Sequence, residues 1–201
     1  MLCGRPVLEY SLRVFLGFPA VDEVILAARA GEEATLRALA ESLSPEKPVT
    51  VVTGGKDRAE SVQNALTAAK GERVLIHDGA RPLVTKELLE DCLAALAQAD
   101  GAAVAVASPD TVKLADADGY VERSTDRSRT YLIQTPQAFY REELLKLHRA
   151  LTEREGITDD CMLLERAGHR VKLVPGRREN IKITTPADRE LAEFYLKKGT
   201  E

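Results

Sequence analysis

No apolar run in this sequence approaches the roughly 18–20 residues that a membrane-spanning helix needs. The first residues, Met1 to Gly4, combine neither a basic start with a long apolar stretch nor a small-residue cleavage site, so nothing marks the chain for export. These absences predict a cytoplasmic protein without a membrane segment.

Cysteine and histidine are scarce, with three residues of each. A disulfide framework or a structural zinc site needs several such residues at close spacing. The cysteines are spread singly at Cys3, Cys92 and Cys161, and the histidines do not complete a metal pattern. We therefore expect reduced thiols and no structural metal site.

An excess of one charge is also missing, because Lys and Arg total 28, Asp and Glu total 32, and the formal net charge is −4. A basic surface is the usual mark of proteins that bind nucleic acids, so nucleic acids are not expected as partners. The 201 residues, 44% of them hydrophobic, suffice for a single sizeable core. We expect one domain over residues 1–201.

Short aliphatic runs alternate with longer stretches of helical spacing, which predicts an α/β fold with a mostly parallel sheet covered by helices on both faces. The chain opens on a helix over residues 7–16. Strands buried on both faces are expected at 23–28, 49–53, 73–77 and 102–107, and helices between them at 32–43, 58–69 and 85–99.

Residues 109–130 break this order, because they are rich in charge and poor in large aliphatic side chains. We expect them to leave the sheet as a β-ribbon arm. Beyond them, helices are expected at 142–153, 159–166 and 186–198, and strands at 170–174 and 181–183. Doubly wound sheets usually open on a strand and a phosphate-binding loop. Either this fold lacks that element, or this reading frame begins after it.

The first candidate motif follows the strand at 49–53. Gly54 and Gly55 allow close approach of a ligand to the backbone, and Ser61 falls in the first turn of the next helix, where free amides favour an anion or a polar nucleotide edge. A plain strand-to-helix turn explains the same residues, and this alternative stays open.

The second motif is Asp78-Gly79-Ala80-Arg81, directly after the strand at 73–77. It places an acid that can hold Mg²⁺ on a polyphosphate beside a cation that can bind an anion. An aspartate that caps a turn and pairs with the arginine is the structural alternative.

A third group of short runs supplies the hydroxyls and cations that grip a polyol phosphate, although each run alone also fits a structural role. The runs are Asp110–Lys113, Thr125–Arg127, Thr135–Gln137, Ile157–Asp160 and Gly176–Thr184.

In this order, from Gly4–Ser11 to the last helix, the motifs resemble those of the 2-C-methyl-D-erythritol 4-phosphate cytidylyltransferases of the non-mevalonate isoprenoid pathway. The resemblance implies a Rossmann-like nucleotidyltransferase fold. It also implies transfer from CTP to methylerythritol phosphate with Mg²⁺ and release of pyrophosphate. The arm at 109–130 would then clasp a second subunit, so that a homodimer completes the substrate pocket.

The resemblance also implies roles for individual residues. Those expected at the nucleotide are Gly54, Gly55, Ser61, Asp78, Gly79 and Ala80. Those expected at the polyol phosphate are Asp78, Arg81, Thr111, Arg127, Thr135, Thr158 and Lys182. Arg127 and Lys182 are the expected catalytic pair, because they position the phosphate for attack, and Asp78 is the expected metal ligand. Gly79 stands where the family carries alanine.

The family's opening strand, its glycine-rich loop with an arginine, and the Pro-Lys-Gln segment after that loop are not found in this sequence, which starts just downstream of them. A single hydrogen-bond donor at such a site stabilises the transition state by ~3–4 kcal/mol, so loss of this loop should lower catalytic activity. Two rival interpretations stay open: a ribitol 5-phosphate cytidylyltransferase, and a non-catalytic or shortened form that binds ligand without turnover.

Overall fold

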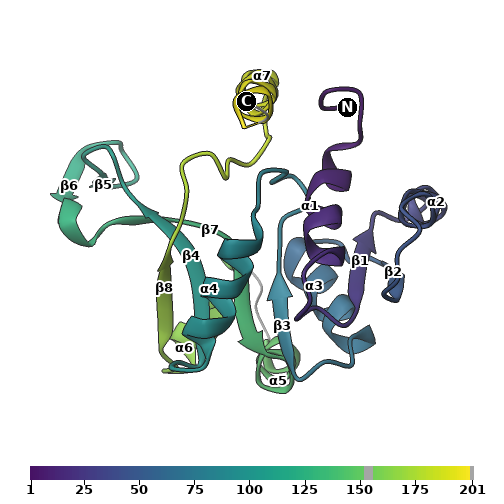
Figure 1. The fold of residues 1–201 in the computed structure, drawn as a ribbon. Coiled ribbons are helices and arrows are strands. Elements are labelled where there is room, and N and C mark those ends of the chain that lie inside the picture. The colour runs from purple at the N-terminus through teal and green to yellow at the C-terminus, as the bar shows by residue number, and fades with distance from the viewer. Residues whose placement is uncertain (152–155, 200–201) are drawn as a thin grey trace.

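The computed structural model describes residues 1–151 and 156–199. Its main sheet has the strand order β3 (Arg73–Ile76), β7 (Tyr131–Tyr140), β4 (Gly101–Ala107) and β8 (Val171–Pro175). β4 and β8 are parallel, and β7 runs antiparallel to both β3 and β4. β3, β4 and β8 therefore point the same way, with β7 reversed between them (Figure 1).

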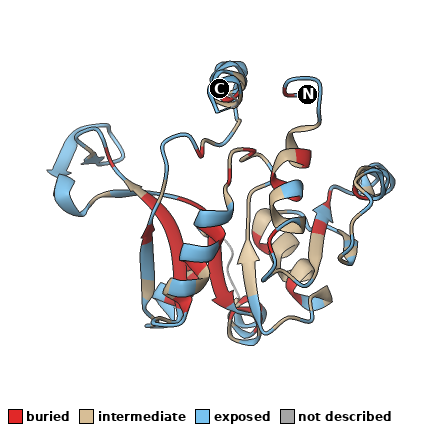
Figure 2. Ribbon diagram, viewed as in Figure 1, coloured by how far each residue is buried: buried red, intermediate tan, exposed pale blue. Residues whose placement is uncertain are grey.

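Helices cover both faces of this sheet, and burial is deepest along β4 and β7 (Figure 2). On one face lies α4 (Lys86–Leu96), whose buried side chains pack on Ala102 and Val104 of β4. On the other face, α3 (Arg58–Ala68), α5 (Arg141–Ala150) and α6 (Cys161–Arg166) enclose a second apolar cluster.

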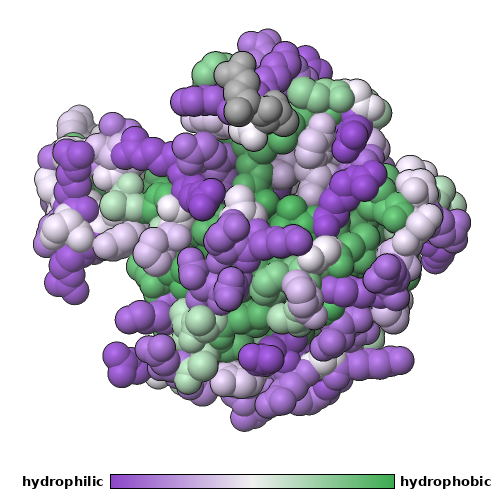
Figure 3. Space-filling view, in the orientation of Figure 1, coloured by the Kyte–Doolittle hydropathy of each residue, from purple (hydrophilic) through white to green (hydrophobic). Residues whose placement is uncertain are grey.

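A separate pair of parallel strands, β1 (Val24–Ala28) and β2 (Val49–Thr53), packs against α1 (Val7–Leu16) and α2 (Glu33–Ser42). Residues of β1, β3, α1 and α3 line a cavity of about 600 Å³ between the two sheets. Figure 3 shows apolar surface gathered across the middle of this face of the molecule, inside a polar rim.

The chain between β4 and β7 forms an arm. Its strands β5 (Lys113–Ala115) and β6 (Val121–Ser124) pair antiparallel, and a short 3-10 turn follows at Arg127–Arg129. All residues of β5 and β6 are exposed, and Figure 1 shows them extending beyond the main sheet. The predicted β-ribbon is confirmed.

The last helix, α7 (Pro186–Lys198), begins where the sequence predicts. Thr185 and Asp188 form a capping box, and Pro186 occupies the first turn. No helix among the described residues is long and apolar enough to cross a membrane.

The α/β class, the alternating order and the helices on both faces are confirmed, with element ends within a few residues of those predicted. The final residues of the helix predicted at 142–153 lie outside the described residues.

Three expectations were wrong. No strand was predicted at 131–140, where β7 lies. Residues 181–183 form no strand, because Ile183 joins the chain at Ala80 through a single backbone hydrogen bond. β1, β2 and β3 are not buried on both faces, since each has exposed residues.

Candidate active site

The candidate site lies where β3 ends. The strand ends at Ile76, and the chain turns so that the Arg81 amide donates a hydrogen bond to the Asp78 carbonyl (2.9 Å). Open α/β sheets bind ligands at this carboxyl end of their strands. Asp78 and Gly79 also line the cavity between β1 and β3, so the loop stands beside an open space.

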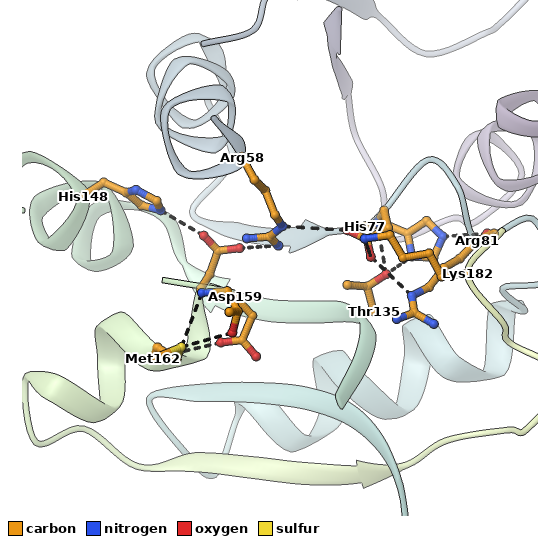
Figure 4. Close-up of polar contacts among 11 residues, drawn as sticks. Arg58, His77, Arg81, Thr135, His148, Asp159, Met162 and Lys182 are labelled. Carbon is orange, nitrogen blue, oxygen red and sulfur yellow. Dashed lines mark hydrogen bonds and ion pairs between the residues drawn. The ribbon is translucent and has the colours of Figure 1, made fainter. Parts of the chain in front are cut away.

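Three cationic side chains from separate segments surround Asp78 (Figure 4). Its Oδ2 lies 3.1 Å from Lys182 Nζ and 3.4 Å from Arg81 Nε. Its Oδ1 lies 3.8 Å from Arg58 Nε. Burial alone raises the pKa of the Asp78 carboxyl, but Lys182, Arg58 and Arg81 outweigh burial and lower that pKa. The carboxylate is therefore ionised, and cations in excess around it suit a phosphate-bearing ligand.

Thr135 and His77 hold the loop in place. The Thr135 hydroxyl accepts a hydrogen bond from the Asp78 amide (3.0 Å) and donates to His77 Nδ1 (2.9 Å). His77 Nε2 donates to the Arg81 carbonyl (3.0 Å). These partners assign a neutral imidazole with its proton on Nε2, and burial lowers the pKa of His77 to about 4. His77 is thus a neutral part of the scaffold at pH 7, and the Thr135 hydroxyl is committed to the same scaffold.

Lys182 reaches Asp78 because its segment is tied to the same loop on both sides. The Ile183 amide donates to the Ala80 carbonyl (2.8 Å), and Arg81 Nη1 donates to the Asn180 carbonyl (2.9 Å). The fully buried Asn180 side chain also donates to the Thr135 carbonyl (2.9 Å) on β7. The extended connection at 181–183 therefore carries the lysine into the site without joining a sheet.

The glycine loop between β2 and α3 adjoins this cluster through Arg58. The Gly55 amide donates to Ser61 Oγ (3.0 Å), and Ser61 Oγ donates to the Asp57 carbonyl (2.8 Å). A Cβ atom on Gly54 would lie 2.9 Å from Ser61 Oγ, so only glycine fits there without displacing the serine. The Ser61 hydroxyl therefore shapes the loop, and Ser61 lines the cavity together with Arg58.

The other predicted substrate residues lie elsewhere in the chain. Thr111 and Arg127 are exposed residues of the arm, whose strands stand away from α1 and β1 in Figure 1. Thr158 lies in the loop before α6, where its hydroxyl donates to Met162 Sδ (3.2 Å). The predicted polyol-phosphate residues that one chain brings together are Asp78, Arg81, Thr135 and Lys182.

Asp78 is the predicted magnesium ligand. Within residues 1–151 and 156–199, no group of three or more His, Cys, Asp or Glu side chains is arranged to hold a metal. Magnesium in nucleotide enzymes is often held by one or two carboxylates and the phosphates of the substrate. Asp78 Oδ1 has its ion-pair partner at 3.8 Å, beyond hydrogen-bond distance, and so fits a single carboxylate ligand for an ion carried by a triphosphate.

Arg58 and Asp160 form an ion pair beside the site that the sequence did not predict. Arg58 Nη2 lies 2.7 Å from Oδ2 of Asp160, whose side chain is fully buried. A buried carboxylate requires a cation or several hydrogen bonds. The available signal was an acidic residue at the start of an apolar helix, but the sequence does not show which cation reaches it.

The chain is similar to known proteins over nearly its whole length. The sequence model of the family 2-C-methyl-D-erythritol 4-phosphate cytidylyltransferase matches residues 1–198. A protein of that name from Clostridium acetobutylicum is 39% identical over 204 residues, which cover 100% of this chain and 89% of the relative. Another from Caldanaerobacter subterraneus is 42% identical over 202 residues, with 98% and 88% covered.

Solved structures lead to the same family. The 4-diphosphocytidyl-2C-methyl-D-erythritol synthase from Anaerococcus prevotii superposes with a TM-score of 0.91 at 35% identity, over 98% of this chain and 91% of that one. The 2-C-methyl-D-erythritol 4-phosphate cytidylyltransferase from Thermus thermophilus gives 0.78 at 31% identity, with the same coverage. The chain belongs to the 2-C-methyl-D-erythritol 4-phosphate cytidylyltransferase family.

Proposed function

We propose that this protein transfers a cytidylyl group from CTP to 2-C-methyl-D-erythritol 4-phosphate and so forms 4-diphosphocytidyl-2-C-methyl-D-erythritol and pyrophosphate. The observation that carries the proposal is the convergence of Arg81 and Lys182 on Asp78 at the carboxyl end of β3. Cations at this edge suit two substrates that both carry phosphate. Membership of the family supplies the nucleotide and the polyol phosphate.

In the proposed reaction, a phosphate oxygen of the polyol phosphate forms a bond to the α-phosphorus of CTP. The bond from that phosphorus to the oxygen bridging to the β-phosphate breaks, and pyrophosphate leaves with the bonding electron pair. Phosphoryl transfer depends on positioning and charge neutralisation more than on covalent chemistry by the protein. The attacking phosphate is already an anion, so no general base is needed. The neutral His77, with hydrogen-bond partners at both ring nitrogens, accords with this mechanism.

We assign the catalytic roles to Lys182 and to Arg127, which neutralise and orient the reacting phosphates. Asp78, Arg81, Thr111, Thr135 and Thr158 are the other proposed contacts of the polyol phosphate, and Gly54, Gly55, Ser61, Asp78, Gly79 and Ala80 form the proposed nucleotide pocket. The committed hydroxyls of Ser61 and Thr135 give these two residues a further part in shaping the loops.

Asp78 would hold the magnesium ion that accompanies CTP. When bound, magnesium neutralises charge on the triphosphate oxygens. The protein orients Asp78 for this purpose. Thr135 accepts a hydrogen bond from the Asp78 amide, and Lys182 pairs with Asp78 Oδ2.

The arm is proposed to join a second copy of the chain. Two of its large apolar side chains are well exposed, Tyr120 (74%) and Val121 (63%), and the adjoining end of β7 exposes Leu132 (49%). Exposed apolar side chains of this kind on a protruding ribbon are typical of a surface that binds another protein chain. In such a homodimer Arg127 would reach the Asp78 site of the partner.

Mixing two inactive variants tests the shared site. If each site takes Lys182 from one subunit and Arg127 from the other, random mixing of K182A and R127A recovers about a quarter of the wild-type activity, because half of the dimers are mixed and each has one intact site. Each variant alone stays inactive. A mixture that stays inactive while native mass spectrometry, with one variant isotope-labelled, shows exchanged dimers would contradict the shared site.

The function itself is tested by pyrophosphate release with CTP and two alternative acceptors. The proposal expects release with methylerythritol phosphate and at least ~100-fold less, as kcat/KM, with ribitol 5-phosphate, which would correspond to about 3 kcal/mol of discrimination. Greater release with ribitol 5-phosphate, or none with either acceptor, would overturn it.

Two further expectations belong to this proposal. We infer that residues 1–201 act as a single cytidylyltransferase domain, which predicts one cooperative unfolding transition. The cytoplasmic location expected from the sequence stays a prediction that cell fractionation can check.

A further inference from the structure

A fully buried acid lies behind the candidate site and connects two helices of the core. Asp160 precedes α6, and its side chain has no exposed area. Its Oδ1 accepts a hydrogen bond from Nε2 of the equally buried His148 on α5 (3.0 Å), and its Oδ2 pairs with Arg58 Nη2 (2.7 Å). Figure 4 shows Arg58 between His148 on one side and the cluster of Arg81 and Lys182 on the other.

The tautomer of His148 follows from its surroundings. A carboxylate accepts hydrogen bonds only, so Nε2 carries the proton. In the part of the chain described, Nδ1 of His148 is buried without a hydrogen-bond partner. Arg58 supplies a positive charge in direct contact with the buried carboxylate of Asp160.

Arg58 has a second acid within reach. Its Nε lies 3.8 Å from Asp78 Oδ1, while its Nη2 lies only 2.7 Å from Asp160. Asp160 is also the more buried of the two, with 0% of its side chain exposed against 16% for Asp78, so its attraction for Arg58 is less screened by water. The two acids compete for one guanidinium, and Asp160 holds it more closely.

This competition determines what Asp78 contacts. With Arg58 held back, Asp78 keeps its close contact with Lys182 at Oδ2, and its Oδ1 is left outside hydrogen-bond distance of Arg58. A guanidinium free to move 1 Å closer would form a hydrogen-bonded pair with Asp78. The attraction between Lys182 and Asp78 would then weaken, and Arg58 would occupy the space beside Asp78 Oδ1.

We propose that Asp160 is a positioning residue of the active site, which restrains Arg58 so that Asp78 remains available to Lys182 and to the substrates, and that His148 supports Asp160 in this role. The inference rests on the proposed function, because it concerns the same site. It adds two buried residues, Asp160 and His148, which act on the site through Arg58.

The test is a double-mutant cycle of D160N and R58M, measured as kcat and KM for methylerythritol phosphate. Displacement of a positioned group by about 1 Å costs up to ~100-fold, so D160N is expected to lower kcat/KM by about 10- to 100-fold when Arg58 is present. In the R58M background the same substitution should cost less than about 3-fold, because the restrained side chain is gone. The matched control is E165Q, which neutralises an exposed acid of α6 and should change neither parameter.

Equal losses of kcat/KM from D160N in the wild-type and R58M backgrounds would overturn the proposal. A loss of kcat/KM explained entirely by a lower melting temperature would overturn it as well. If D160N does not fold, H148L and H148Q replace it. The glutamine keeps a donor near Nε2 and should retain activity, whereas the leucine should lose it in an Arg58-dependent way. Equal activities of these two variants would count against the role of Asp160.

A readout without substrate separates this inference from the proposed function. The Arg58 Nε–H signal in ¹⁵N NMR should respond weakly to D78N in the otherwise wild-type protein and more strongly in D160N, since only a released guanidinium pairs closely with Asp78. The same response in both proteins would refute the restraint even in a protein that makes no product. Conversely, the expected NMR pattern without pyrophosphate release would leave the restraint standing and refute only the proposed function.

Discussion

Replacing Lys182 with methionine should separate catalysis from stability. The Lys182 side chain is 44% exposed and lies 3.1 Å from Asp78 Oδ2. Ion pairs so open to water contribute at most about 1 kcal/mol to folding. For a chain of this size, that is a change in Tm of about 2–4 °C. Methionine keeps the length of the side chain and removes the charge, so K182M should fold and melt nearly as the wild type does.

The effect on turnover should be much larger. A cation directed at the charge that develops in the transition state contributes ~3–4 kcal/mol, which corresponds to a 10²- to 10³-fold lower kcat. The assay is pyrophosphate release at saturating CTP, with CTP affinity measured separately by calorimetry. CTP affinity should change little, because Lys182 is not among the residues of the proposed nucleotide pocket.

The control is K172M, at an exposed lysine of β8 that is not part of the site. Full activity of K182M would refute the role of Lys182. A loss of activity matched by a fall in Tm of more than about 10 °C would assign the lysine a structural role.

Three other outcomes are expected. The folded-state pKa of His77 is about 4, below its usual value of 6.5, so the stability that comes from keeping this ring neutral is present above pH 6.5 and is lost as the pH falls toward 4. The free energy of unfolding by urea should fall over that range, and the His77 ring should not titrate by NMR between pH 6.5 and 8. The pKa of Asp78 is lowered in the folded state, so protonation of this carboxylate lowers the free energy of unfolding further at more acidic pH. T135V should lower the free energy of unfolding by about 1–3 kcal/mol, because the Asp78 amide and His77 Nδ1 lose their partner, whereas T135S keeps the hydroxyl and should not. An unchanged unfolding curve for T135V, or an equal fall for T135S, would contradict this. For the mixing of R127A with K182A, recovery should also fall when the arm residue Val121 is replaced by aspartate, if exchange requires the arm.

The helices of this protein were predictable because local signals fix them. α7 has a threonine cap and a proline in its first turn, and α3 is capped by Asp57, whose side chain accepts a hydrogen bond from the Glu60 amide. Such signals act within a few residues and so can be identified from the sequence.

β7 escaped prediction because its buried residues are not all apolar. Gln134, Thr135 and Gln137 are buried, and Pro136 lies among them. A run of this kind has neither the alternation nor the aliphatic content of an ordinary strand. The Gln134 amide and the Thr135 hydroxyl form hydrogen bonds with segments distant in sequence, such as the Arg177 carbonyl that accepts a hydrogen bond from Gln134.

The candidate site was likewise predictable only where its residues are close in sequence. Asp78 and Arg81 are neighbours in sequence, and their spacing after a strand indicated the chemistry. Lys182 stood in one of the scattered candidate runs, and only the resemblance to a family gave it a role in this site. Its approach depends on hydrogen bonds from the Ile183 amide to Ala80 and from the Arg81 side chain to the Asn180 carbonyl. The pairing of Arg58 with Asp160 joins α3 to the start of α6 and has no local signal at all.

We propose that nucleotide and polyol phosphate meet at Asp78, between the glycine loop and the Lys182 segment. The decisive experiment is a crystal structure with the product, 4-diphosphocytidyl-2-C-methyl-D-erythritol. We expect a diphosphate oxygen within about 3.2 Å of Lys182 Nζ, with the cytosine against Gly55 and Ser61. Clear density for the product at a site remote from Asp78 and Lys182 would contradict it.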